Sequence, residues 1–200
     1  MVVVGLTGGI AMGKSVVLTG IRSIIEDARI FDADQCVSEL LTHEEICEKV
    51  STVFGDSSLT NDGQIDRHYL RERAFDSVDQ RAKLEGILHP GVHKEYLMAL
   101  NSAERDDVPF LIADIPLLYE SSHNYNQDLT LVVASDDKAQ MERLLMRPGI
   151  SEEMARKMIE AQLPIKKKIK LADHLIWNSG SIKQLEKQIY YFALWLKKKK

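Results

Sequence analysis

A glycine-rich segment near the start of the chain has the residue types and spacing of a phosphate-binding loop. Residues 8–15 have the sequence GGIAMGKS, which matches the pattern G-x-x-x-x-G-K-[ST]. Glycines let the backbone fold around an anion with its N–H groups pointing inward, the lysine reaches the β- and γ-phosphates of ATP, and the serine hydroxyl holds Mg²⁺. The residues expected to bind ATP are Gly8, Gly9, Ile10, Ala11, Met12, Gly13, Lys14, Ser15 and Val16. An ordinary glycine turn with a solvated lysine is the alternative.

Two acidic residues, Asp32 and Asp34, follow the second apolar run of the chain. The carboxyl ends of parallel strands meet at one edge of a sheet, where ligands bind. A carboxylate there can orient a substrate hydroxyl, accept its proton or hold a metal-bound water. We therefore predict that Asp34 faces the phosphates and acts on an acceptor hydroxyl, with Asp32 beside it. The alternative is that Asp34 caps a helix that starts at Gln35.

The elements around these residues have the order of a nucleotide-binding α/β fold. Short apolar runs rich in β-branched residues predict strands buried in a parallel sheet, and apolar residues at helical spacing follow Lys14. Strand, glycine loop, helix and strand form a βαβ unit, so we predict the three-layer sandwich of P-loop NTPases around a five-stranded parallel sheet. The expected strands are residues 2–6, which should be central, and 28–31, 110–113, 129–134 and 175–177.

Helical patterns fill the rest of the chain. Residues 35–107 contain no convincing strand and are too long for a simple crossover, so we predict an inserted helical lobe. A second helical pair, at about 136–146 and 151–163, flanks the break at Pro148-Gly149 and is expected to form a lid. The last helix should pack on the core through Ile182, Leu185, Ile189, Phe192 and Leu196.

We therefore expect one domain, residues 1–200, built from a core, a lobe and a lid, with a solvated lysine tail at 197–200. The expected parts are a core at about 1–60, 105–135 and 172–200, a helical lobe at about 61–104, and a lid at about 136–171.

Composition argues against several classes of protein. The net charge of -4 is unlike that of proteins whose main partner is a nucleic acid. Cys36 and Cys47 are too few for a disulfide framework or a metal knuckle, which favours the reducing cytoplasm. No stretch approaches the ~18 apolar residues of a membrane span, and the start lacks the basic region of a signal peptide. We expect a cytoplasmic protein, with neither nucleic acid nor a membrane as partner, and we favour a monomer.

A phosphate loop alone does not separate a kinase from a GTPase, a motor or a nucleotide-gated switch. Further motifs accompany it along residues 1–190: GLTGGI and GKS at 5–10 and 13–15, DAD at 32–34, LEGILHP at 84–90, DIPLLYE at 114–120, Arg143-Leu144 with Arg147, Ala161-Gln162, and Ala172-Asp173 with Ile176, Asn178 and Gly180. In this order the motifs resemble those of the dephospho-CoA kinase family. The resemblance implies a phosphotransferase that uses ATP and Mg²⁺ to phosphorylate the ribose 3′-hydroxyl of dephospho-CoA, the last step of CoA biosynthesis. A nucleoside or nucleotide kinase and a slowly hydrolysing ATP switch are the alternatives.

The same resemblance implies roles for single residues. Asp34 corresponds to a general base and Lys14 to the phosphate-binding lysine, while Arg143 and Arg147 resemble lid arginines that close over ATP. Both arginines stand at i and i+4 on one helix face, so solvated side chains are the alternative. The helical lobe resembles the family's acceptor-binding region. The residues expected to contact dephospho-CoA are Asp32, Asp34, Arg67, Leu70, His89, Pro90 and Leu117.

Three further positions complete the expected site. Asp114 ends the third strand, where a carboxylate would meet Mg²⁺ through water, together with the hydroxyl of Ser15. Asn178 and Gly180 follow the fifth strand and resemble the loop beside the adenine, although a plain turn would also explain them. Pro90 is expected to end a helix, which would make His89 a turn residue. The same break in the helix argues against a metal site made by His89 and a nearby histidine.

The loop and the residue after it depart from the family pattern at three positions. Ala11 and Met12 replace the usual Gly and Ser, and Val16 stands where Thr is common. A methyl group at Ala11 is tolerable only if that residue has a negative φ, so loop geometry or ATP affinity is expected to differ. Lys14 and the flanking glycines remain, so we expect activity. A lysine cluster at 166–168 and 170 is interpreted as a solvated helix face, with help to the phosphates as the alternative.

Overall fold

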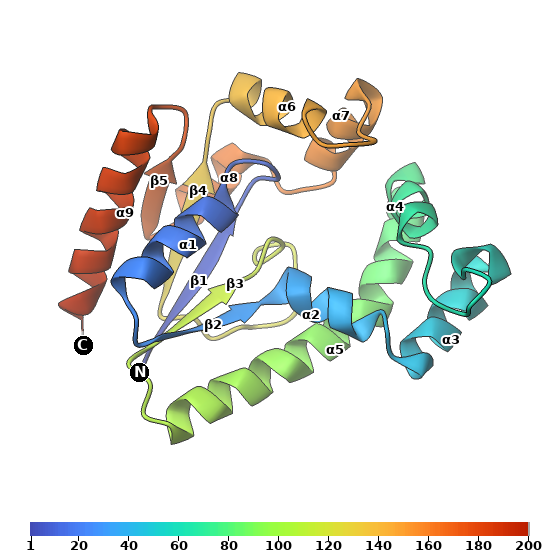
Figure 1. Cartoon of the computed structure of the whole chain (residues 1–200), viewed down its shortest axis with the longest axis horizontal. Helices are drawn as coiled ribbons and strands as arrows, with labels where there is room; N and C mark the ends of the chain where they lie inside the picture. Colours follow the sequence, from blue (N-terminus) through green and yellow to red (C-terminus); the bar gives the residue numbers. More distant parts are fainter. Residues whose placement is uncertain (200) are drawn as a thin grey trace. The chain divides into compact units, whose positions relative to one another are not determined.

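The computed structural model describes residues 1–199, and its strands form one parallel sheet in the order β2-β3-β1-β4-β5 (Figure 1). β1 lies at the centre, as predicted, because its residues from Val3 onward are buried on both faces. The five-stranded parallel sheet is therefore confirmed. The strands are β1 (Val2–Gly8), β2 (Ala28–Asp32), β3 (Phe110–Asp114), β4 (Leu129–Ala134) and β5 (His174–Trp177).

The helices divide between two compact units. The first unit is Met1–Asp32 with the chain from Met98 onward, and the second unit is Ala33–Leu97. The helices are α1 (Lys14–Ile24), α2 (Ala33–Leu40), α3 (Glu44–Phe54), α4 (Arg67–Asp76), α5 (Val78–Arg105), α6 (Asp137–Leu145), α7 (Glu152–Glu160), α8 (Ile165–Leu171) and α9 (Ile182–Lys197). Within residues 1–199, no helix is both long enough and apolar enough to span a membrane.

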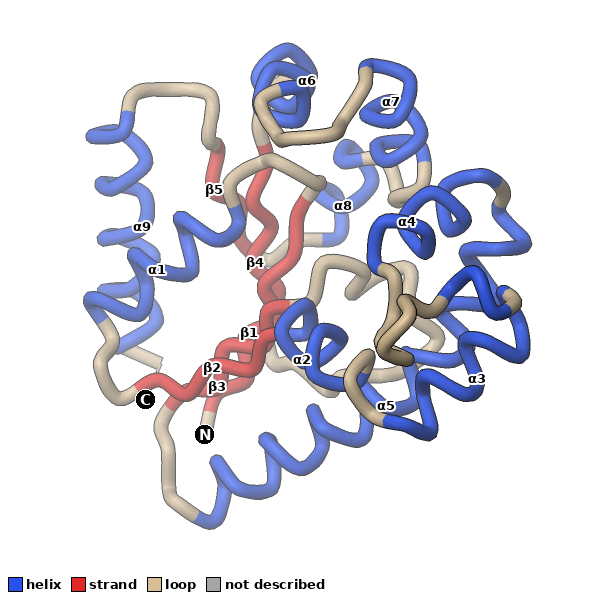
Figure 2. The backbone as a smooth tube through the Cα atoms, turned by 45° about the vertical axis from the view of Figure 1, so that its right-hand side comes forward, coloured by secondary structure: helices blue, strands red, loops and turns tan. Residues whose placement is uncertain are grey.

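In the first unit, α1 and α9 lie side by side along one face of the sheet (Figures 1 and 2). Val17 of α1 and Phe192 of α9 are buried in one cluster with Leu6 and Ile112 of the central strands. The predicted apolar stripe of α9 is thus confirmed, except at its first residue. Ile182 is 60% exposed, so it does not belong to the core.

The opposite face of β4 is covered by α8. Ile165 and Ile169 pack on a small cluster that includes Val132 and Met12 of the phosphate loop (residues 8–15). The expected helix at 151–163 ends at Glu160, and α8 is a separate helix that starts after Pro164. The lysine-rich segment is therefore packed against the sheet.

The second unit is helical, as predicted, with one isolated bridge between Leu59 and Ile65 among its residues. The expectation that Pro90 ends a helix is wrong, because α5 continues through it. Pro90 is exposed and cannot donate the helical N–H bond to the carbonyl of Gly86, so α5 continues with that hydrogen bond missing.

Candidate active site

The phosphate loop joins the end of β1 to the start of α1, as predicted. Gly13 stands just before α1 with a left-handed φ of 95°. A Cβ at Gly13 would lie 2.0 Å from Asn178 Nδ2, and a Cβ at Gly8 would lie 2.3 Å from the carbonyl oxygen of Val133. A side chain would clash at either position, so both require glycine, and the backbone conformation of Gly13 favours glycine as well.

Ala11 contradicts the expectation of a negative φ. Its φ is 58°, in the left-handed region that costs a residue with a Cβ about 1 kcal/mol or more. The next residue, Met12, is fully buried against Val132 and Ala134 of β4. Its long apolar side chain therefore anchors the loop to the sheet, which accounts for a methionine at this position.

The carboxyl ends of the central strands gather charged groups beside the phosphate loop. Lys14 Nζ lies 2.5 Å from Asp114 Oδ1, and the two side chains are 13% and 4% exposed. Asp114 ends β3 as predicted, and Asp32 at the end of β2 pairs with it in register. This juxtaposition places an ammonium group and a buried carboxylate where a phosphate would bind.

The predicted acceptor residues, apart from Asp32 and Leu117, all lie in the second unit. Asp34 is exposed in the first turn of α2, and since that helix begins at Ala33, Asp34 is not the residue that caps it. Arg67 Nη2 donates to the carbonyl oxygen of Ser38 at 3.0 Å, and Leu70 is buried in the core of the unit. His89 is half-buried. Contact between these predicted residues and an acceptor molecule stays a prediction.

The two predicted lid arginines differ in their surroundings. Arg143, on α6, donates from Nη2 to the carbonyl oxygen of Asn178 at 2.8 Å. Its Nη1 is buried and has no hydrogen-bond partner in residues 1–199. Arg147 lies beyond the end of α6 and is exposed. Arg143 therefore keeps an unused donor, as a residue that binds a phosphate would, whereas Arg147 has the surroundings of a solvated arginine.

Asn178 and Gly180 are more than parts of a plain turn. Asn178 is 8% exposed, and its Nδ2 donates to the carbonyl oxygen of Met12 at 2.9 Å. A Cβ at Gly180 would lie 2.3 Å from Gln184 Oε1, which bonds Ser181 at the start of α9. Asn178 thus contacts the phosphate loop, and Gly180 makes room for a helix cap.

Two glutamines that sequence reasoning did not assign to the site hold Ile10 of the phosphate loop. Gln140 Nε2, on α6, donates to the carbonyl oxygen of Ile10 at 2.9 Å, and the N–H of Ile10 donates to Gln162 Oε1 at 2.8 Å. Gln162 belongs to a motif that resembles the family, but no role followed from it. Gln140 carries no local sequence signal, because glutamine is mostly an exposed residue.

Lys168 contradicts the expectation of a solvated lysine face. Its side chain is fully buried, and Nζ lies 2.8 Å from Glu120 Oε1, 3.0 Å from the carbonyl oxygen of Pro116 and 3.4 Å from that of Gly8. Burial lowers the pKa of Lys168, while Glu120 opposes that shift. All three donors of this ammonium therefore have acceptors, and it connects α8 to the end of β1. Its neighbour Lys167 is exposed, as predicted.

Comparison with known proteins identifies the family to which this site belongs. Residues 2–184 match the model of a family described as dephospho-CoA kinase. The chain belongs to the dephospho-CoA kinase family. The resemblance noted in the motifs is thereby confirmed along almost the whole chain.

Named members of the family match over nearly their full length. A dephospho-CoA kinase of Fusobacterium nucleatum is 35% identical over 193 residues, 96% of this chain and 97% of its own. One from Carboxydothermus hydrogenoformans is 38% identical over 188 residues, 94% of this chain and 90% of its own. The solved structure of a dephospho-CoA kinase from Campylobacter jejuni has the same fold, with a TM-score of 0.70 and 24% identity over 98% of this chain and 97% of that one.

The donor set suits the Mg²⁺ that a kinase of this family would use. Ser15 offers a hydroxyl at the start of α1 and Asp114 a buried carboxylate, and Mg²⁺ prefers such hard oxygen ligands. Within residues 1–199, no group of three or more His, Cys, Asp or Glu side chains is placed to hold a metal. Two oxygen ligands from the protein suit an ion that nucleotide phosphates would help to hold.

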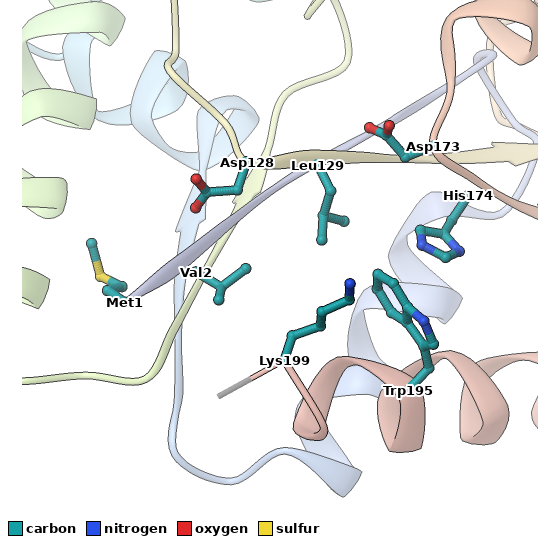
Figure 3. A pocket seen from close by; sticks show the side chains of 8 residues that line it. All are labelled: Met1, Val2, Asp128, Leu129, Asp173, His174, Trp195 and Lys199. Atoms are coloured by element: carbon teal, nitrogen blue, oxygen red, sulfur yellow. The ribbon is translucent and has the colours of Figure 1, made fainter.

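A hollow of about 560 Å³ lies at the other end of the sheet (Figure 3). Val2, Leu129 and His174, the first residues of three strands, line it together with Trp195. The phosphate loop follows the opposite, carboxyl end of β1. This hollow is therefore separate from the kinase site of the family, which the strands' carboxyl ends form.

Proposed function

We propose that this chain transfers the γ-phosphoryl group of ATP to the ribose 3′-hydroxyl of dephospho-CoA, which gives ADP and CoA in the last step of CoA biosynthesis. Membership in the dephospho-CoA kinase family over residues 2–184 supports the substrate. The observation that carries the phosphoryl-transfer chemistry is the pair of Lys14 and buried Asp114 beside the phosphate loop.

Lys14 exchanges its partner when ATP binds. Its ammonium leaves Asp114 for the β- and γ-phosphates, where it stabilises negative charge that moves during transfer. A buried carboxylate left without a cation is strongly destabilising, so Asp114 then requires a new counter-ion. Asp114 and Ser15 would hold Mg²⁺ together with the phosphates, and the ion would supply that charge and help to neutralise the transferring group.

The remaining roles follow the family's motifs. Arg143 directs its unused Nη1 at the transferring phosphoryl group, and Asp34 orients the 3′-hydroxyl and accepts its proton. The second unit, with Arg67, His89 and Pro90, binds the acceptor. Catalysis is then mainly positioning and charge neutralisation, with no covalent intermediate on the protein.

The proposed acceptor is a small molecule, and the proposed location is the cytoplasm. Cys36 and Cys47 form no disulfide and both are buried, which suits a reducing compartment.

Turnover of purified protein with ATP, Mg²⁺ and a panel of acceptors tests this function. We expect phosphorylation of dephospho-CoA and not of nucleosides or nucleoside monophosphates. Asp34→Asn should lower kcat by ~10² or more with little change in ATP affinity, since a general base typically contributes that much. Asp56→Asn, at an exposed position of the second unit, is the control. Wild-type turnover of Asp34→Asn would remove Asp34 from catalysis, and preference for another acceptor would contradict the substrate.

A further inference from the structure

Two amide side chains hold the backbone of the phosphate loop from outside it. Gln140 Nε2 donates to the carbonyl oxygen of Ile10 and Asn178 Nδ2 to that of Met12, each at 2.9 Å. A carbonyl oxygen can only accept, so each amide must present its nitrogen to the loop. Gln140 is 4% and Asn178 8% exposed; the bond from Asn178 is buried, and the bond from Gln140 is partly buried.

The held carbonyls fix the direction of the N–H groups that follow them. In a trans peptide, the C=O of one residue and the N–H of the next point in opposite directions. The N–H groups of Ala11 and Gly13 therefore point away from Gln140 and Asn178, and neither has a hydrogen-bond acceptor in residues 1–199. Ala11 and Gly13 both have a left-handed φ, 58° and 95°, and such backbone gathers N–H groups into an anion-binding hollow.

The intervening N–H groups are already used within the protein. Ile10 donates its N–H to Gln162 Oε1 at 2.8 Å, and Met12 donates its N–H to the carbonyl oxygen of Gly9 at 3.1 Å. Along residues 10–13, therefore, N–H groups that donate within the protein alternate with N–H groups that can donate to a ligand.

The glycines of the loop give the amides access to its backbone. A Cβ at Gly13 would lie 2.0 Å from Asn178 Nδ2, and a Cβ at Gly9 would lie 3.2 Å from Gln140 Nε2. A side chain at Gly13 would push Asn178 away from the Met12 carbonyl. Gly13 and Asn178 thus depend on one another, whereas a Cβ at Gly9 would first meet Met12 Sδ, at 2.6 Å.

We propose that Gln140 and Asn178 are positioning residues that aim the N–H groups of Ala11 and Gly13 at the phosphates of ATP. The proposal rests on the proposed function, because it takes ATP as the nucleotide bound by the loop. It gives Asn178 a role at the phosphates and not beside the adenine. It also adds Gln140, which stands about 130 residues after the loop in the sequence, to the nucleotide site.

Removing each amide while keeping its size tests the proposal. Isothermal titration of full-length Gln140→Met and Asn178→Leu measures affinity for ATP and for inorganic tripolyphosphate, which lacks the nucleoside. We expect each variant to lose roughly tenfold in affinity, by the same factor for both ligands, because misdirecting one N–H group removes about one net hydrogen bond. If Asn178→Leu weakens ATP and leaves tripolyphosphate unchanged, the assignment of Asn178 to the phosphates is overturned.

Tyr69→Phe is the matched control. Tyr69, on α4, donates from its hydroxyl to the carbonyl oxygen of Phe54 at 3.2 Å, so this change also removes a side chain–backbone hydrogen bond, but within the second unit, which contains no residue of the phosphate loop. It should lower the melting temperature and leave both affinities unchanged. Wild-type affinities in Gln140→Met and Asn178→Leu, at a temperature where all variants are folded, would overturn the proposal whatever their melting temperatures. A wild-type protein that binds ATP but does not phosphorylate dephospho-CoA would contradict the proposed function alone.

Discussion

At the scale of single residues, Ala11 carries a side chain where the backbone of the phosphate loop favours glycine. Ala11→Gly removes the left-handed strain, so we expect the free energy of unfolding to rise by about 0.5–1 kcal/mol, after the greater flexibility of glycine in the unfolded chain is allowed for. Denaturant unfolding of the two proteins measures the difference. The control variant is Ala161→Gly, at the end of α7. Ala161 has no positive φ, so this change relieves no strain and should lower the free energy of unfolding.

Single residues also show how far the site could be predicted from the sequence. Gly8, Gly13, Lys14 and Ser15 were predictable because a phosphate loop requires them at fixed local spacing. Gln140 was not, because its partner lies about 130 residues away and the burial of an amide depends on tertiary contacts. The φ of Ala11 was also beyond prediction, since the loop path depends on the amides that hold it.

At the scale of elements, the strands were predictable and the packing of one helix was not. Runs such as 129–134 are apolar and β-branched because β4 is buried on both faces, and the ends of β4 in the structure agree with the sequence pattern. The packing of α8 was missed because lysines surround its apolar pair, Ile165 and Ile169, which pack on β4. The sequence of such a lysine-rich helix does not reveal which lysine is buried, here Lys168.

The ion pair of Lys168 and Glu120 fixes α8 to the first unit. Lys168→Met removes the cation from Glu120, whose partly buried carboxylate, 19% exposed, keeps the N–H of Leu163 as a partner, so we expect a loss of about 1–3 kcal/mol in the free energy of unfolding. Lys167→Met, on the exposed face of the same helix, should change it by less than about 0.5 kcal/mol. Denaturant unfolding compares them, and adding Glu120→Gln to Lys168→Met should restore part of the loss. Equal stability of the two lysine variants would show that the pair does not fix the helix.

At the scale of the whole molecule, stability should depend on the protonation of His174. Burial lowers the pKa of His174, with Asp173 opposing the shift and Lys199 adding to it. The unfolded chain therefore binds a proton more readily, so the stabilising contribution is complete above about pH 6.5 and is lost as the pH falls through the folded-state pKa. The melting temperature of the wild type should fall more between pH 7.5 and 5 than that of His174→Phe, whose ring keeps the contact with Trp195.

A histidine outside the fold's core is the comparison for this pH profile. His68 is exposed on α4, so His68→Gln should retain the wild-type dependence of melting temperature on pH. If His174→Phe follows the same curve as the wild type, His174 is not the group responsible.

The central claim is that the site around Lys14 and Asp114 passes a phosphoryl group from ATP to the 3′-hydroxyl of dephospho-CoA. The most direct test is mass spectrometry and phosphorus NMR of the product formed by purified protein with ATP, Mg²⁺ and dephospho-CoA, alongside Lys14→Met. The account predicts CoA phosphorylated at the ribose 3′ position with the wild type, and loss of at least ~10² in its rate of formation with the variant. ADP formed without CoA, or CoA formed equally fast by Lys14→Met, would contradict it.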